Sequence, residues 1–464
     1  MMDLQRLVAA VGAADVVGGT PVEVRDLAYD TRAVAPGAVF FCVPGARADG
    51  HDFAAEAVER GAVALVVEHP LDVSGPQVVM RDARIAMAAA ADEFFAHPTE
   101  ELQVAGVTGT NGKTTTTFLL YAILAAAGRR PGLIGTIEAR VGGERRGVRR
   151  TTPEAIDLQR LFREMLDAGD RSVALEASSH ASALHRLDHV RFAVLVFTNL
   201  SHEHLDFHAD MEEYFEAKRR LFLDGDPPAA VNVGDAYGRR LAAELPDALT
   251  FGSADDAQIG PAALVGIEFK LRGRFNIENA LAAFAAARLL GIEDAAIARG
   301  LESVRGVSGR FEAIEEGQPF EVIVDYAHKP VALELVLLTV RELSVGRVIC
   351  VFGCGGDRDR EKRPEMGRIA FELADVVIVT NDNPRSEDPQ AILDAIVAGA
   401  VGGVEVEPDR ALAIAHAIEL AHEGDVVLIA GKGAEQGQEF ADRTVPFDDR
   451  EAAREALRRL GAHT

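Results

Sequence analysis

A chain of 464 residues is too long for one ordinary hydrophobic core, and about 150 residues per domain gives roughly three domains. Its formal net charge of −25 repels nucleic acid and anionic lipid, so we expect neither partner, and an anionic ligand must be held by local cations or metal ions. Three cysteines, no signal-peptide pattern and no apolar run near the 18 or so residues of a membrane span favour a cytoplasmic protein without disulfides.

Residues 1–97 alternate short strand-like and helical segments, which indicates a small α/β unit. We expect strands at Ala38–Val43, Val63–Val67 and Gln77–Met80, and helices at Phe53–Arg60 and Ile85–Phe95. The loop containing Thr31 is rich in polar and turn-forming residues, which are either structural or ligand-binding. His97-Pro98 marks the end of the unit, because proline ends the preceding helix.

The segment Val104 to Leu120, VAGVTGTNGKTTTTFLL, has the pattern of a phosphate-binding loop between a strand and a helix. Glycines let the loop curl until its N–H groups and the helix N-terminus face one anion. Lys113 adds positive charge, and the Thr114 hydroxyl can ligate magnesium. The expected ligand is a nucleoside triphosphate, although Val107 occupies the place of the first glycine in the common pattern.

A strand is expected at Gly132–Ile137, followed by a hairpin around Val141 to Glu144. The next helix is expected to begin in the sequence TTPEAIDLQ, with Thr152 as its N-cap and Pro153 at the first helical position. That capping interpretation accounts for Thr152, so a substrate-binding role for Thr151 and Thr152 needs separate support.

Two apolar strands of this region end in chemistry-bearing residues. SVALEASSH places Glu176 at a strand end, where parallel strands face the ligand crevice and where an acid is a natural magnesium partner of a triphosphate. The strand Phe192–Phe197 runs into TNLSHEHLDFH, whose ionisable residues indicate a metal or phosphate role for at least one of them. These residues are His202, Glu203, His204, Asp206 and His208.

The predicted helix Met211–Phe222 carries a lysine, Lys218, in the middle of its apolar face. One interpretation is that its stem covers the core while the amine reaches water. The other is that the amine is buried, which favours its neutral, nucleophilic form. A neutral lysine can react with carbon dioxide to give a carbamate, an anionic oxygen ligand for magnesium.

Asn276 and Asn279 open an alanine-rich helix, where they either contact a nucleotide base or cap the helix. From about Gly306, strands again alternate with helices, which predicts a parallel, doubly wound sheet. We expect its strands at Phe320–Val324, Arg347–Phe352, Val376–Val379 and Val426–Ile429. Polar residues follow each strand, so the strand ends define a binding crevice, in which Arg358 and Arg385 either hold carboxylates or form surface salt bridges.

These blocks, in this order over nearly the whole chain, resemble those of the Mur ligase superfamily of ATP-dependent amide-forming enzymes, most closely its MurE type. They are GTNGKTTT, LEASSH, TNLSHEHLDFH, YFEAKRRLF, GRFNIENALAA, SGRFE, VDYAHKP, FGCGGDRDREKRP, DNPR and AGKGAE. The resemblance implies an α/β fold of three domains: a UDP-binding N-terminal domain (1–97), a central P-loop ATPase-like domain (98–305) and a C-terminal Rossmann-like domain for the incoming amino acid (306–464).

The resemblance also implies roles for individual residues. Catalytic roles fall to Lys113, Glu176, His204 and Lys218, and magnesium to Thr114, Glu176, His204 and Lys218 as its carbamate (N6-carboxylysine). ATP would be bound by Gly109, Thr110, Asn111, Gly112, Lys113, Thr114, Thr115, Asn279, Arg310, Asp325 and His328. The UDP-sugar-peptide would be bound by Thr31, Thr151, Thr152, Ser178 and Arg186. Diaminopimelate would be bound by Arg358, Asp382, Asn383, Arg385, Gly431 and Glu435.

The implied reaction adds diaminopimelate to UDP-N-acetylmuramoyl-L-alanyl-D-glutamate through an acyl phosphate, with ATP as co-substrate and Mg²⁺ as cofactor. We expect a monomer whose last domain closes over the central one during turnover. The alternatives are addition of another diamino acid such as lysine, a folylpolyglutamate synthetase-like ligase, and a nucleotide-binding regulatory scaffold. Two departures from the family pattern stand out: Ala434 replaces the histidine of GKGHE, and Lys329 replaces a common threonine.

Overall fold

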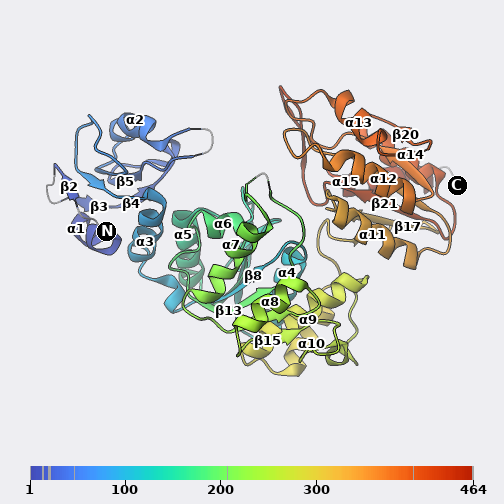
Figure 1. Cartoon of the computed structure of the whole chain (residues 1–464), viewed down its shortest axis with the longest axis horizontal. Coiled ribbons are helices and arrows are strands. Elements are labelled where there is room, and N and C mark those ends of the chain that lie inside the picture. The colour runs from blue at the N-terminus through green and yellow to red at the C-terminus, as the bar shows by residue number, and fades with distance from the viewer. Residues whose placement is uncertain are drawn as a thin grey trace. The chain divides into compact units, whose positions relative to one another are not determined.

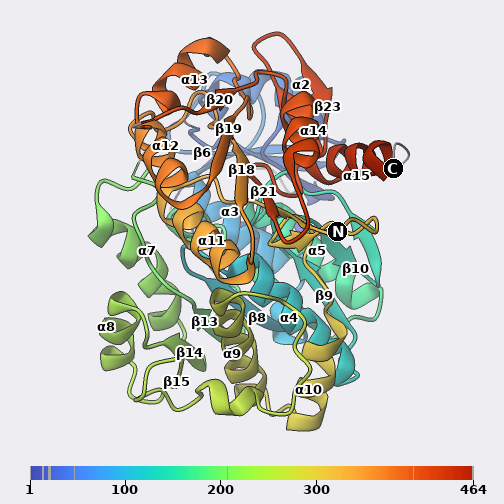
Figure 2. The ribbon, with the colours of Figure 1, turned by 90° about the vertical axis from the view of Figure 1, so that its right-hand side faces the viewer.

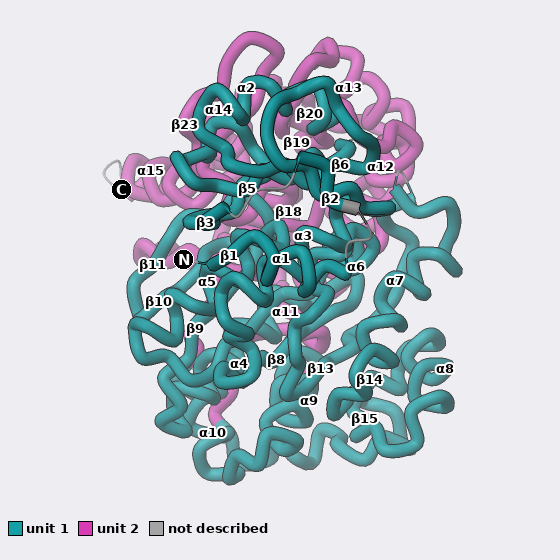
Figure 3. Tube along the Cα trace, turned by 90° about the vertical axis from the view of Figure 1, so that its left-hand side faces the viewer, with its two compact units in different colours: residues 1–267, 278–303 teal, residues 268–277, 304–464 magenta. Residues whose placement is uncertain are grey.

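The computed structural model of the chain describes residues 2–12, 15–18, 22–45, 48–205, 207–400 and 402–461 (Figure 1). The chain divides into two compact units, residues 1–267 with 278–303, and residues 268–277 with 304–464 (Figure 3). The predicted domain boundaries near residues 97 and 305 remain predictions.

The first unit begins with a five-stranded sheet in the order β2-β7-β6-β5-β4, parallel except for the β2–β7 pair. Both faces are covered, because Val39 and Phe41 pack with α1 and α3 while Phe40 and Cys42 pack with α2. The strands are β2 Asp15–Val17, β4 Asp26–Ala28, β5 Ala38–Phe41, β6 Ala64–Val67 and β7 Gln77–Val79, beside the short pair β1 Met2–Asp3 and β3 Glu23–Val24. The helical segments are α1 Leu4–Val11, η1 Thr31–Ala33, η2 Gly50–Phe53, α2 Ala54–Glu59 and α3 Ala83–Phe94.

An eight-stranded sheet follows in the order β11-β10-β9-β12-β8-β13-β14-β15. The six strands from β9 to β15 in this order are parallel, so the carboxyl ends of β12, β8 and β13 are neighbours at one edge. The strands are β8 Gln103–Thr108, β9 Pro131–Ile134, β10 Ala139–Val141, β11 Glu144–Arg146, β12 Ser172–Glu176, β13 Phe192–Phe197, β14 Ala229–Asn232 and β15 Leu249–Phe251. The predicted hairpin is confirmed, since Val141 pairs with Glu144.

Helices cover this sheet. Residues of α5, α6, α7 and α8 share one core cluster with β8, β12 and β13, and Figure 1 shows α5, α6 and α7 grouped beside β8. Helix α4 packs against β8, β9 and β12, with α10 against it. The helical segments are η3 Pro98–Glu100, α4 Lys113–Ala126, α5 Ala155–Asp167, α6 Ser179–Ala183, α7 Met211–Leu223, α8 Ala236–Glu244, η4 Pro261–Leu264, α9 Arg274–Leu289 and α10 Asp294–Ser303.

The second unit is built on a six-stranded sheet in the order β16-β17-β21-β18-β19-β20, parallel except for β16. Alternate residues of β18 face opposite helix layers: Cys350 and Phe352 pack with α11, α12 and α13, and Ile349 and Val351 pack with α14 and α15. Figure 2 shows α11 and α12 on one side of β18 and β21, and α14 on the other. The predicted doubly wound parallel sheet is therefore confirmed.

The elements of this unit are β16 Glu312–Ala313, β17 Glu321–Asp325, α11 Pro330–Leu343, β18 Val348–Phe352, α12 Lys362–Leu373, β19 Val376–Val379, α13 Pro389–Val397, β20 Glu405–Val406, α14 Arg410–Leu420, β21 Val426–Ala430, β22 Gly437–Glu439, β23 Thr444–Pro446 and α15 Asp449–Gly461. Among the described residues, none of the helices combines the length and the apolar character that crossing a membrane requires.

Candidate active site

The phosphate-binding loop predicted from the sequence connects β8 to α4. Gly109 and Gly112 have positive φ (145° and 84°), which residues with a side chain rarely adopt. A Cβ atom at Gly109 would lie 1.9 Å from the Thr198 hydroxyl oxygen, and one at Gly112 would lie 2.2 Å from the Asn279 side-chain oxygen. Both glycines are therefore required by close packing as well as by backbone conformation.

Residues that follow β13 hold the loop in place. The Thr110 and Asn111 amides donate to the backbone and side-chain oxygens of Asn199 (2.8 and 2.9 Å), and the Thr198 hydroxyl donates to the Asn111 carbonyl (2.7 Å). The loop is thus supported by the neighbouring strand end. Asn279, inside α9, accepts from Thr116 at 3.4 Å, beside Thr115, so the capping alternative for Asn279 is wrong.

Two lysines from different helices meet at one backbone oxygen of this loop. Lys113 donates to the Gly109 and Thr110 carbonyls (2.9 and 2.7 Å), and Lys218 of α7 donates to the same Gly109 carbonyl (3.0 Å). The Lys218 side-chain nitrogen also lies 4.6 Å from the centre of the Tyr214 ring. The two lysine side chains therefore share one backbone acceptor of the phosphate loop.

Lys218 is 1% exposed, so its amine does not reach water and the snorkelling alternative is wrong. Burial, together with the charge of Lys113, holds the pKa of Lys218 well below its usual value. A neutral amine at this position has the nucleophilic lone pair that carbamate formation requires. The carbamate itself remains a prediction.

Glu176 ends β12 and is buried, and it receives three hydrogen bonds from threonines. The Thr136 amide and hydroxyl donate to its two oxygens (2.8 and 3.0 Å), and the Thr114 hydroxyl donates at 3.1 Å. The Thr151 and Thr136 hydroxyls are 3.0 Å apart. The structure thus joins the phosphate loop to the acidic strand end and to one predicted substrate residue. Thr136 is free to do so because β9 ends at Ile134, three residues before the predicted end of that strand.

The predicted N-cap role of Thr152 is wrong, because α5 begins at Ala155 and its N-cap position is Glu154. The Thr152 hydroxyl instead donates to the Glu176 carbonyl (2.6 Å) and lies 3.1 Å from the Ser178 hydroxyl. Arg186 donates to the Thr152 carbonyl (3.2 Å) and pairs with buried Glu154 (2.8 Å). Thr152, Ser178 and Arg186 are therefore gathered beside Glu176. Thr31 lies in η1, which follows β4 of the first sheet.

The histidine-rich loop after β13 packs its rings between α6 and α7. The His204 ring lies 4.6 Å from that of His180, and the His208 ring stacks on Tyr214 at 5.1 Å. His204 also pairs with Glu203 (2.8 Å) and has a φ of 57°, which is rare for a residue with a side chain. Asp206 lies outside the described residues. No group of three His, Cys, Asp or Glu side chains in the described part of the chain is arranged to hold a metal ion.

In the second unit, Asp325 is the last residue of β17 and His328 follows it. Asp325 accepts from the amides of Phe311 and Ala327, both at 2.7 Å, and burial raises its pKa. Burial and the nearby charge of Lys362 lower the pKa of His328 to about 3, so its ring is neutral at physiological pH. The Arg310 guanidinium lies 4.3 Å from the centre of the Tyr326 ring. These residues, predicted to bind adenosine, lie at one edge of the six-stranded sheet of the second unit.

At the same edge, the loops after β19 and β21 bring most of the predicted amino-acid residues together. The Asn383 amide donates to Glu435 (2.9 Å), and buried Asp382 lies against Gly431, where a Cβ atom would be 2.7 Å from its carboxylate. Burial raises the pKa of Asp382. Arg385 has a φ of 53° and donates to the Gly356 carbonyl (2.8 Å).

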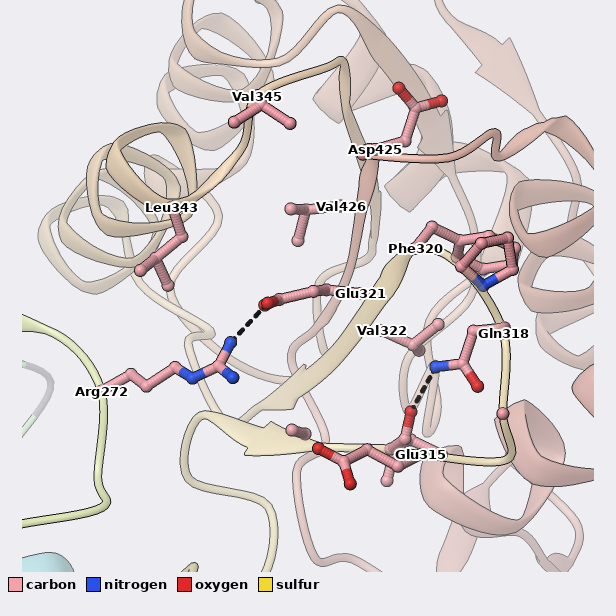
Figure 4. Close-up of a pocket in the computed structure, with 15 residues that line it drawn as sticks. Arg272, Glu315, Gln318, Phe320, Glu321, Val322, Leu343, Val345, Asp425 and Val426 are labelled. Atoms are coloured by element: carbon pink, nitrogen blue, oxygen red, sulfur yellow. Dashed lines mark hydrogen bonds and ion pairs between the residues drawn. The ribbon is translucent and has the colours of Figure 1, made fainter.

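Arg358 is exposed and donates to the carbonyl of its neighbour Asp357 (3.0 Å). The Ser386 hydroxyl, in the loop after β19, donates to the Asp357 carboxylate (2.6 Å), so the segment that carries Arg358 meets that loop. A cavity of about 550 Å³ in the second unit is lined by none of the predicted residues (Figure 4). It lies at the amino-terminal ends of β17 and β21, where Arg272 points at Glu321 and Gln318 donates to the Ile314 carbonyl.

Sequence reasoning missed three groups that shape these sites. The sequence predicts Thr136 inside a strand and assigns no role to Lys432 or to the buried Arg410–Asp449 pair. An arginine and an aspartate 39 positions apart carry no sequence signal of pairing. Lys432 did have one, because, like Lys113, it directly follows a glycine in the segment after a parallel strand.

Models of three Mur ligase regions match the sequence. The Mur ligase family catalytic domain matches residues 23–107, the Mur ligase middle domain residues 107–287, and the Mur ligase glutamate ligase domain residues 309–433.

Two relatives named UDP-N-acetylmuramoyl-L-alanyl-D-glutamate--2,6-diaminopimelate ligase are similar over almost their whole length. The one from Solibacter usitatus is 46% identical over 469 residues and covers 95% of each chain. The one from Geobacillus thermodenitrificans is 44% identical over 493 residues, covering 98% of this chain and 99% of its own. A solved structure of a ligase with this name has a TM-score of 0.66 and 31% identity, covering 95% of this chain and 96% of its own.

Proposed function

The chain belongs to the Mur ligase family, and from this premise we propose that it catalyses the ATP-dependent addition of diaminopimelate to UDP-N-acetylmuramoyl-L-alanyl-D-glutamate in peptidoglycan precursor synthesis. The observation that carries the proposal is the 44–46% identity to relatives of that name over at least 95% of this chain. This similarity spans both the phosphate loop and the loops that follow β19 and β21.

In the proposed reaction, the free carboxylate of the D-glutamate attacks the γ-phosphorus of ATP and ADP leaves, which gives an acyl phosphate. The diaminopimelate amine then attacks the acyl carbon, loses a proton and displaces phosphate. Lys113 and the loop amides offset negative charge on the phosphates, and Thr151, Thr152, Ser178 and Arg186 orient the acyl substrate. Arg310, Asp325, His328 and Asn279 would hold the adenosine.

The residues around Glu176 fit a magnesium ion. Magnesium prefers oxygen ligands, and the Thr114 hydroxyl lies 3.1 Å from the Glu176 carboxylate. Thr114, Glu176, His204 and Lys218 as its carbamate would hold the metal. When bound, it would offset charge on the phosphates.

The amino-acid residues fit a ligand with more than one charged end. Arg385 and Arg358 would bind carboxylates, and Glu435 with Asn383 would bind an ammonium group. Lysine lacks the second carboxylate of diaminopimelate, so an arginine that binds this carboxylate favours diaminopimelate over lysine.

We place the enzyme in the cytoplasm and treat it as a monomer. Cys42, Cys350 and Cys354 are free and buried, and burial raises the pKa of each thiol to about 12, so these cysteines are inert. Free thiols are typical of reducing compartments.

The test is phosphate release measured with purified protein, ATP, Mg²⁺, UDP-N-acetylmuramoyl-L-alanyl-D-glutamate and one amino acid at a time. We expect release with diaminopimelate that depends on both co-substrates, and much less with lysine. Release with lysine at the same efficiency would shift the proposal to that amino acid. Release with a folate substrate would favour a folylpolyglutamate synthetase-like ligase, and no release under any condition would favour a regulatory scaffold.

A further inference from the structure

Lys432 is a fully buried lysine to which neither the family blocks nor the proposed mechanism assigns a role. It follows β21, between Gly431 and Gly433, whose φ angles are 120° and 55°. Its side chain is 0% exposed. Lysine is almost never buried to this degree unless it is paired, because removing an ammonium group from water is costly.

The Lys432 ammonium is paired with two residues predicted to bind the amino acid. It donates to the Asn383 side-chain oxygen (2.9 Å) and to one carboxylate oxygen of Glu435 (3.0 Å). The Asn383 side-chain amide donates to the same oxygen of Glu435 (2.9 Å). Three side chains therefore form a closed triangle of hydrogen bonds, and Lys432 is its fully buried member.

The triangle continues to Arg385. The Asn383 side-chain oxygen also accepts from the Glu439 amide (3.1 Å), and the Glu439 carboxylate pairs with the Arg385 guanidinium (2.7 Å). Asn383 is thus fixed from both sides, by Lys432 and by β22. The same contacts connect the loop after β19, the loop after β21 and strand β22.

Glu435 needs such support because its neighbour provides none. Position 434 is alanine, whose side chain has no hydrogen-bonding group. Glu435 is 37% exposed, so its carboxylate remains accessible to a ligand while one of its oxygens is held from within the protein. A preorganised binding group must be accessible to the ligand on one side and held by the protein on the other, and the Glu435 carboxylate meets both conditions.

We propose that Lys432 is the positioning residue of the amino-acid site, which orients Glu435 and Asn383 for the ammonium group of the incoming diamino acid. This inference rests on the proposed function. Lys432 itself does not touch the ligand. Its effect is to keep the Glu435 carboxylate in one orientation, and so to lower the entropic cost of binding the amino acid.

The test compares Lys432→Met, which keeps the length of the side chain and removes its charge and hydrogen bonds, with the wild-type protein. We expect the KM for diaminopimelate to rise at least tenfold, with the KM values for ATP and the UDP-substrate within twofold of wild type. A purely structural role would lower the melting temperature and the amount of active protein but leave the KM for diaminopimelate unchanged. Lys432→Gln retains a hydrogen-bond donor, so its KM for diaminopimelate should lie between those of the wild type and Lys432→Met. If Lys432→Met does not fold, Lys432→Gln is compared with the wild type in the same way.

A double-variant cycle with Glu435→Gln tests the route of the effect. If Lys432 acts through Glu435 and Asn383, the double variant raises the KM by less than the product of the two single effects. A full product, or an unchanged KM in folded Lys432→Met, would overturn the inference. Lys270→Met is the matched control, because Lys270 is an exposed lysine of the same unit, and it should behave as wild type.

Failure of the proposed function would look different. Wild-type protein would then add another amino acid in place of diaminopimelate, and the KM comparison would be made with that amino acid. If wild-type protein adds diaminopimelate and Lys432→Met leaves its KM unchanged, the positioning role alone is wrong.

Discussion

Lysine side chains on helix faces usually carry their charge into water, and the burial of Lys218 reverses that behaviour. The helix buries Tyr214, Phe215, Leu221 and Phe222 on the same face, so the lysine stem enters the core with them. Its amine donates to the Gly109 carbonyl and lies near the charge of Lys113. A neutral amine is the state that burial favours here.

We expect Lys218→Ala to lower turnover by more than about 100-fold, because the variant removes a proposed magnesium ligand and a group beside the phosphate loop. Phosphate release under saturating co-substrates measures this. Lys218→Glu, which restores a carboxylate, should recover part of the activity at best. Removal of dissolved carbon dioxide should slow the wild-type enzyme, and bicarbonate should restore it.

Arg219→Ala is the control for that experiment, because Arg219 is the next residue of α7 and pairs with Glu216 and Glu244 near the surface. Its turnover should stay within about twofold of wild type. Full activity of Lys218→Ala would rule out the metal-binding role of Lys218.

Individual site residues were predictable from the sequence where a motif fixes the backbone. Gly109, Gly112 and Lys113 lie where the loop pattern requires them. Thr152 was assigned wrongly because a threonine followed by proline and glutamate is also a typical helix start, and only its contact with the Glu176 carbonyl distinguishes the two roles. Lys432 was overlooked because its partners Asn383 and Glu435 lie in loops that meet only in the folded sheet.

At the scale of elements, buried parallel strands were the most predictable features. The predicted strands Phe192–Phe197 and Val376–Val379 agree with β13 and β19 to the residue, since near-continuous apolar runs mark strands covered on both faces. The short edge elements were not predicted. β22 and β23 have three residues each and mixed polarity, yet β22 carries the partner of Arg385.

The contact between β22 and Arg385 leads to a prediction about the choice between diaminopimelate and lysine. Glu439→Gln removes the charged partner of the Arg385 guanidinium, which then samples more orientations and binds a carboxylate less well. Because lysine has no second carboxylate, we expect the preference for diaminopimelate over lysine in kcat/KM to fall about fivefold. An unchanged preference would contradict the role of Glu439. Glu372→Gln is the control, since Glu372 makes a comparable exposed pair with Arg368 on α12.

Asp449, the first residue of α15, is expected to contribute to the stability of the fold. Asp449 and Arg410 form an ion pair with both side chains 0% exposed, and Arg410 also donates to the Ala430 carbonyl (2.9 Å) at the end of β21. Asp449→Asn leaves a buried guanidinium without its counter-charge, so we expect a loss of about 3 to 5 kcal/mol in the free energy of unfolding. Urea unfolding followed by circular dichroism measures it.

Asp442→Asn is the matched control, because Asp442 is exposed and pairs with the adjacent Arg443. Its stability should change by less than about 0.5 kcal/mol. Replacing both buried partners, as Arg410→Met with Asp449→Leu, should be less destabilising than Asp449→Asn alone. Equal stability of Asp449→Asn and wild type would show that the pair contributes nothing.

At the scale of the whole molecule, titratable groups with shifted pKa values make the stability of the second unit depend on pH in opposite directions. The pKa of His328 is lowered to about 3 when folded, so below about pH 6.5 the unfolded chain binds a proton that the folded chain does not, and stability falls as the pH falls. Burial raises the pKa values of Asp325 and Asp382, so their contribution to stability rises as the pH falls from their folded pKa values toward the ordinary carboxyl value.

Replacing His328 isolates one of these contributions. His328→Gln keeps a donor for the Tyr326 carbonyl, which the His328 ring contacts at 2.7 Å, and removes the titrating group. Between pH 7 and pH 5 the wild-type chain should lose on the order of 2 kcal/mol more than the variant, because the unfolded histidine becomes protonated over that range. Urea midpoints at the two pH values measure the difference. The control is His422→Gln, at an exposed histidine of the same unit, which should keep the wild-type pH dependence. If His328→Gln also keeps that dependence, the His328 ring accepts its proton in the folded protein as readily as in the unfolded chain.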